Sequence, residues 1–258
     1  SAGSLEKLVG KPLYPLPTVR SKPGDGESSS PEAFVERLRS IDLRNSWRGC
    51  DRLGTLCSTI FLLPEEKREP FVKEALSFLA SIQDTETGLW GEGSLYVRIS
   101  GTFKLHTFYR RLNIPMPKTA RIYESILTCR RNEEAVDMCY IRNPIDLLSY
   151  MNHPIPHREW SEILEITIEN MKRLKREDGG FSRELSGSPP APNVAQVKKG
   201  EQYPEMPEPV FLSQGLVEGD MNASTQATLI RLQAHKLSGL PEHPLPDAER
   251  FYSKVMFE

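Results

Sequence analysis

A chain of 258 residues and 29.3 kDa is long enough to bury a substantial hydrophobic core. Its net charge of −2 and isoelectric point near 6.3 lack the basic excess that nucleic-acid binding requires. No apolar run approaches the ~20 residues that span a bilayer, and the first residues lack a secretory signal pattern. The 4 cysteines are too few for a disulfide scaffold. We therefore expect a cytoplasmic protein with no nucleic-acid partner and no membrane span.

The beginning of the chain, residues 1–30, is rich in proline, glycine and serine and predicts a flexible lead-in. From residue 31 to residue 258 we expect one domain. Ser30 followed by Pro31 is a helix-start signal, because serine caps a helix and proline suits its first turn. Apolar spacing predicts the first helices at residues 31–41, 47–63 and 65–82.

The third of these helices ends in a distinctive turn, in the stretch FLASIQDTETGLWG at residues 78–91. A similar helix starting near Trp160 also ends in glycines and an aromatic residue, at Gly179, Gly180 and Phe181. Two helices that each end in a glycine-plus-aromatic turn indicate an internal repeat.

This turn carries the residues of a known repeat, which are Leu79, Gln83, Gly88 and Trp90. Their spacing resembles the Q…G-x-W repeat of squalene and terpenoid cyclases, whose relatives include the protein prenyltransferase β subunits. In the second copy Lys175 replaces the glutamine and Phe181 replaces the tryptophan. The resemblance implies an all-α fold, an α/α toroid that is either closed or incomplete. It also implies a structural motif, in which the glutamine ties a helix end to its neighbour and the aromatic ring packs across the turn.

Further helices are predicted at residues 100–112, 119–130 and 222–237, with short ones at 145–151 and 247–256. Asn143-Pro144 is expected to start the helix at 145–151. Residues 186–210 are rich in proline and without periodicity, which predicts a long loop, lid or disordered segment.

In a toroid the inner helices line a central cavity, and the loops that enter them form its mouth, where a ligand is expected. The helices at 100–112 and 222–237 are the expected inner helices. Polar and aromatic groups near the starts of inner helices are then the candidate ligand-binding residues: Trp47, Arg98, His106, Asp137, Cys139, Tyr140, Arg142, Asp220 and Asn222.

Asp137-Met138-Cys139-Tyr140 is similar to the Asp-x-Cys-Tyr segment with which protein prenyltransferases bind zinc. That family places a histidine about one helix before a Ser-Gly-Leu segment. Here Ser238-Gly239-Leu240 is present, but the family's spacing falls on Leu232, with His235 about one turn away. The alternative is a partly buried cysteine beside an aspartate that caps a helix. The sequence thus assigns no metal ligand, and no cofactor is expected.

Motifs for isoprenoid cyclisation, Asp-x-Asp-Asp and Asp-Asp-x-x-Asp, are not present in the sequence. A glycosidase would need two carboxylates, for which Glu218 and Asp220 are candidates. A polysaccharide lyase would use Tyr140 or His106 as base, with Arg142 neutralising a uronate. For Asp220 to Ser224 the alternative is an ordinary helix start, with Asn222 or Ser224 as its cap.

We therefore expect a small molecule in the cavity, with two functions open. The protein is either an enzyme acting on a saccharide or isoprenoid-type substrate, or a non-catalytic toroid scaffold that binds a partner protein or ligand. No catalytic residue is assigned.

Overall fold

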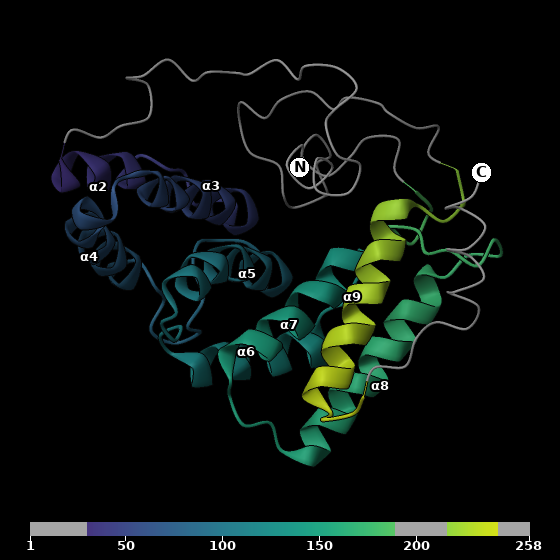
Figure 1. Ribbon diagram of the computed structural model, residues 1–258. Helices are drawn as coiled ribbons and strands as arrows, with labels where there is room; N and C mark the ends of the chain where they lie inside the picture. Colours follow the sequence, from purple (N-terminus) through teal and green to yellow (C-terminus); the bar gives the residue numbers. More distant parts are fainter. Residues whose placement is uncertain (1–29, 189–215, 242–258) are drawn as a thin grey trace, which may run out of the picture.

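The computed structural model describes residues 30–188 and 216–241, which are built from helices, with only isolated β-bridges between extended segments (Figure 1). The helices are α2 (Pro31–Arg39), α3 (Ser46–Ser58), the 3-10 helix η1 (Thr59–Leu62), α4 (Glu65–Ser81), α5 (Leu95–Leu112), α6 (Thr119–Asn132), α7 (Met138–Met151), α8 (His157–Leu174) and α9 (Met221–Leu237). The all-α prediction is confirmed for this part of the chain. The lead-in before Ser30, most of the loop at 186–210 and the helix at 247–256 lie outside the described residues.

Two helices begin earlier than the sequence predicted. α5 starts at Leu95 and not near residue 100, because the Ser94 hydroxyl accepts a hydrogen bond from the Val97 amide. The carboxylate of Glu133 also accepts from the first amides of α5, at 3.0 Å from Leu95 and 3.2 Å from Tyr96. The acidic partner of this helix start, Glu133, comes from a distant part of the chain, so the sequence around residue 95 does not show it.

α7 starts at Met138 and not near residue 145. The Asp137 carboxylate caps it, with Oδ1 2.7 Å from the amide of Cys139. Pro144 therefore lies inside the helix, and its expected role as a start signal was wrong.

Alternate helices of the chain pack in a continuous series. α3 packs against α5, α5 against α7, and α7 against α9, as the progression across Figure 1 shows. We call these four helices the row. α4 packs on α2 and η1, and α6 contacts α5, α7 and α8. The row supplies much of the core, including the fully buried Leu53, Ile99, Leu105 and Leu147.

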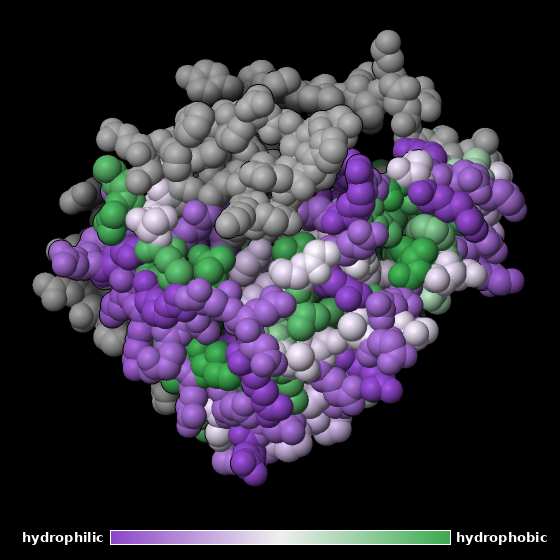
Figure 2. All heavy atoms as spheres, turned by 180° about the vertical axis from the view of Figure 1, so that it is seen from behind, coloured by the Kyte–Doolittle hydropathy of each residue, from purple (hydrophilic) through white to green (hydrophobic). Residues whose placement is uncertain are grey.

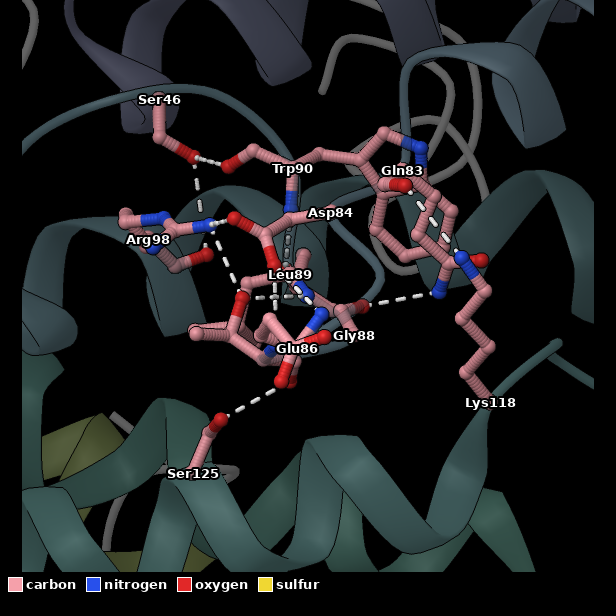
Figure 3. A network of polar contacts seen from close by, with 12 residues as sticks. Ser46, Gln83, Asp84, Glu86, Gly88, Leu89, Trp90, Arg98, Lys118 and Ser125 are labelled. Carbon is pink, nitrogen blue, oxygen red and sulfur yellow. Dashed lines mark hydrogen bonds and ion pairs between the residues drawn. The ribbon is translucent and has the colours of Figure 1, made fainter.

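The turn after α4 is held by side chains that are themselves buried (Figure 3). Gln83 Nε2 donates to the carbonyl of Gly88 at 2.8 Å and to that of Pro117 at 3.1 Å. The indole of Trp90 is fully buried and donates to the carbonyl of Leu79 at 2.8 Å. Because Pro117 stands just before α6, Gln83 joins the end of α4 to the start of the next-but-one helix. These contacts support a structural role for the turn.

The turn after α8 repeats this arrangement with different side chains. Phe181 follows Gly179 by two residues, as Trp90 follows Gly88. Both glycines have positive φ, of 70° at Gly88 and 85° at Gly179. The Ser46 amide, at the start of α3, donates to Glu92 two residues after Trp90. The Met138 amide, at the start of α7, donates to Arg183 two residues after Phe181. The two turns therefore share a glycine with positive φ and a backbone hydrogen bond to the start of α3 or α7.

None of the described helices combines the length and apolar character needed to cross a membrane. Figure 2 shows one face of the molecule, where apolar residues form separate patches between hydrophilic ones.

Candidate functional site

A cavity of about 420 Å³ opens along the row. Every helix of the row contributes to its lining, which consists of Trp47, Phe103, Lys104, Cys139, Arg142, Asn143, Met221, Asn222, Thr225, Gln226 and Leu229. Its size lies in the range of pockets that hold small molecules. None of these described lining residues carries a carboxylate.

The two cations in the lining are held by carboxylates that stand behind them. Arg142 Nε lies 2.7 Å from Asp146 Oδ2, one helical turn along α7, as an ion pair whose N–H is not directed at that oxygen. Asp146 is 1% exposed, and burial raises the pKa of its carboxyl while the charge of Arg142 opposes that rise. Lys104 Nζ lies 3.1 Å from the more exposed Asp51. Each cation therefore has a carboxylate partner outside the lining.

Each cation also lies against an aromatic ring of the lining. The Arg142 guanidinium is 5.0 Å from the centroid of Phe103, and Lys104 Nζ is 5.2 Å from that of Trp47. The cavity therefore combines flat apolar surface with positively charged hydrogen-bond donors.

Three amide side chains complete the polar lining. Asn143 Nδ2 donates to Ser100 Oγ at 3.0 Å, so this amide is already oriented. Gln226 is hydrogen-bonded to Asn222 one turn earlier on α9 and is only 5% exposed. Its Oε1 is buried without a partner among the described residues. If the amide oxygen and nitrogen of Gln226 exchanged positions, the buried atom without a partner would be the nitrogen of this side chain.

Of the predicted ligand-binding residues, the cavity brings together Trp47, Cys139, Arg142 and Asn222. Two aspartates serve as helix caps instead. Asp137 Oδ2 also binds Arg183 Nε at 2.8 Å, in an ion pair whose aspartate is fully buried. Asp220, and neither Asn222 nor Ser224, caps α9, and its Oδ2 accepts from the amide of Arg183 at 2.9 Å.

The remaining three predicted residues take part in packing or in the turn. Tyr140 stacks on Tyr96, with centroids 5.0 Å apart. Arg98 pairs with Asp84 at 3.2 Å, inside the turn network of Figure 3. His106 was expected to face the cavity or solvent, yet it does not line the cavity and is 3% exposed.

His106 is packed between two other rings. Its centroid is 4.8 Å from that of Phe103 and 4.3 Å from that of Tyr150, both in stacked geometry. Nδ1 contacts the carbonyl of Phe103, and Nε2 is buried without a hydrogen-bond partner in the described structure. Burial lowers the pKa of this imidazole to about 4, and the nearby charges of Arg110 and Arg142 add to the effect.

The proposed zinc ligands do not form a cluster. Asp137 pairs with Arg183. His235, near the end of α9, has its Nδ1 2.8 Å from the carbonyl oxygen of Pro241. Within residues 30–188 and 216–241, no three His, Cys, Asp or Glu side chains are arranged to hold a metal ion. The prenyltransferase-like zinc set therefore does not fit these side chains.

Sequence reasoning missed several lining residues, chiefly Phe103, Lys104, Asn143, Thr225 and Gln226. The signal for α9 was present: Asn222, Thr225, Gln226 and Leu229 recur at the spacing of one helical face. No such signal marks Lys104, which sits mid-helix beside buried positions.

Comparisons with protein-family models, curated proteins and solved structures found no significant match to this chain.

Proposed function

We propose that this protein binds a small polar molecule in the cavity of the row. The observation that carries the proposal is the lining itself, in which all four helices of the row contribute side chains to one cavity of about 420 Å³. Aromatic surface together with a few oriented polar groups is the usual composition of a small-molecule site.

The scaffold that we propose is an incomplete α/α toroid of the terpenoid cyclase and prenyltransferase type. Its support is the packing of alternate helices into the row, together with the repeated turn at Gly88–Trp90 and Gly179–Phe181. In such an arrangement the row forms the inner wall, and the site lies on the wall. The free thiols of all four cysteines support the expected cytoplasmic location.

The composition of the lining favours a saccharide over an isoprenoid. An isoprenoid chain requires an almost wholly apolar wall, because buried polar groups left without partners are costly. Here Arg142, Asn143 and Gln226 would face such a chain. The hydroxyl groups of a saccharide can satisfy them, and its C–H face can stack on Trp47.

Binding without hydrolysis is favoured over a glycosidase. Hydrolysis of a glycosidic bond uses a pair of carboxylates on either side of the scissile bond. The described lining offers none, and Asp220 is occupied as the cap of α9. A scaffold that holds a ligand is therefore the function that the geometry supports best.

The test is isothermal titration calorimetry of the full chain against a panel of neutral and charged monosaccharides and disaccharides. We expect at least one to bind, with affinity reduced at least tenfold in Trp47→Leu. Phe71→Leu is the control, because Phe71 is also a partly buried aromatic residue and lies outside the cavity. Binding that Trp47→Leu leaves unchanged, or no binding across the panel, would contradict the proposal.

A further inference from the structure

We propose that the ligand is a hydroxylated carboxylate of the sugar-acid class, with its carboxylate on Arg142 and a hydroxyl group on Gln226. This inference rests on the proposed function and specifies the chemical class of the ligand at the same site.

Arg142 is oriented so that part of its guanidinium remains available to a ligand. The Nε edge faces Asp146 at 2.7 Å and the charge lies over the ring of Phe103. No other described group is hydrogen-bonded to the two terminal nitrogens, and the residue lines the cavity. A planar guanidinium with its terminal nitrogens available binds a carboxylate through two parallel hydrogen bonds.

The surroundings add to the attraction for an anion. Lys104 Nζ stands in the same lining, and its partner Asp51 is 48% exposed, so water screens that carboxylate. No lining carboxylate among the described residues would repel a ligand anion.

A single negative charge fits this cavity better than two. Arg142 is paired with the buried Asp146, and Lys104 is paired more weakly with the exposed Asp51. The cavity therefore offers less than two full positive charges. A dianionic phosphate would have to be desolvated against two existing ion pairs, which costs more than desolvating one carboxylate.

Gln226 identifies the second feature of the ligand. It is 95% buried and lines the cavity, yet one of its amide atoms has no partner in the described structure. Buried polar atoms in native proteins nearly always have a hydrogen-bond partner, so an orphan at a cavity wall indicates a missing ligand group. A hydroxyl group can serve either amide atom, because it both donates and accepts.

The experiment compares the affinities of glucose, glucuronate and glucose 6-phosphate for the full chain at fixed ionic strength. We expect glucuronate to bind at least tenfold more tightly than either of the others. The variant Arg142→Gln with Asp146→Asn replaces the ion pair by an amide pair of similar shape, so no buried charge is stranded. It is expected to abolish the preference for glucuronate, because the affinity for glucuronate falls more than the affinity for glucose. Arg142→Lys, which keeps the charge but not the planar fork, is expected to reduce the preference too.

Two matched controls separate the roles. Arg121→Gln removes an exposed arginine that pairs with Glu124 away from the cavity and should leave the preference intact. Gln226→Leu should weaken glucose and glucuronate alike, whereas Gln233→Leu on the same helix should weaken neither.

Two results would overturn the inference while leaving cavity binding intact: equal affinity for glucose and glucuronate, or a preference for glucose 6-phosphate, each still sensitive to Trp47→Leu. Failure of every compound to bind would remove the proposed function together with it.

Discussion

Gly88 and Gly179 occupy corresponding places in two copies of the same turn, but their surroundings differ. A Cβ added at Gly88 would lie 2.9 Å from the backbone nitrogen of Ile122, whereas one at Gly179 would meet nothing within 4 Å. Both residues have positive φ, so both carry the same backbone penalty for a side chain.

We expect Gly179→Ala to cost about 1 kcal/mol of unfolding free energy, from backbone strain alone. Gly88→Ala should cost at least about 2 kcal/mol more, because α6 must move away from the turn. Urea denaturation of the two variants measures the difference. Equal losses would mean that the contact with α6 is not tight.

His106 makes the stability of the protein depend on pH. Its folded pKa, about 4, lies below the unfolded value near 6.5. Protonation therefore favours the unfolded chain. The stabilising contribution is complete above pH 6.5 and is lost as the pH falls towards 4, by up to about 3 kcal/mol.

His106→Phe preserves a ring between Phe103 and Tyr150 and removes the titrating group. We expect it to flatten the loss of stability between pH 6.5 and 4, measured by denaturation at several pH values. A steep profile in His106→Phe would assign the pH dependence to other groups.

The start of α7 is joined to the segment after α8 by the buried pair of Asp137 and Arg183. Their charges are 2.8 Å apart, with side-chain exposures of 0% and 9%. Removing one member leaves an unpaired buried charge. We therefore expect Arg183→Leu to destabilise the fold by about 3–5 kcal/mol.

Asp137→Asn together with Arg183→Leu should recover part of that loss, because no full charge is then stranded while the amide oxygen can still cap α7. The thermal unfolding of the single and double variants gives the coupling energy. A double variant less stable than Arg183→Leu alone would show that the cap requires a charged aspartate.

Residues 189–215 leave and re-enter the described structure at one place. The Ser188 amide donates to the carbonyl of Leu216 at 2.9 Å, and its hydroxyl donates to that of Glu218 at 2.7 Å. These hydrogen bonds join the two ends of the described chain that flank residues 189–215.

The helices that the sequence predicted best are those with local signals. α2, α4, α6 and α9 were placed within two residues of both ends, because apolar spacing lies within each segment. A side-chain cap adds to this signal in α2 and α9, but not in α4 and α6. α5 was placed late, since Glu133 comes from beyond α6. α7 was also placed late, because Pro144 was taken as a boundary although α7 contains it. The start of α5 depends partly on a distant residue, whereas α7 starts at a local cap, Asp137, which the sequence left open between capping and ligand binding.

Four of the predicted site residues line the cavity, and all four lie near the beginnings of α3, α7 and α9. Asp137, Asp220 and Arg98 could not be separated from these by sequence alone. An aspartate before a helix is equally suited to capping or to ligand binding. Only the position of Arg183 decides that Asp137 belongs to an ion pair.

The cavity is shared between the first and second halves of the fold. Trp47 and Phe103 come from α3 and α5, whereas Arg142 and Gln226 come from α7 and α9. A cut between α6 and α7 would leave two fragments, each carrying part of the lining. If the cavity binds the proposed ligand, the two fragments would have to reassociate before binding, so the ligand would stabilise their complex. On that proposal the two fragments are the parts of a split sensor, in which their reassociation reports the ligand.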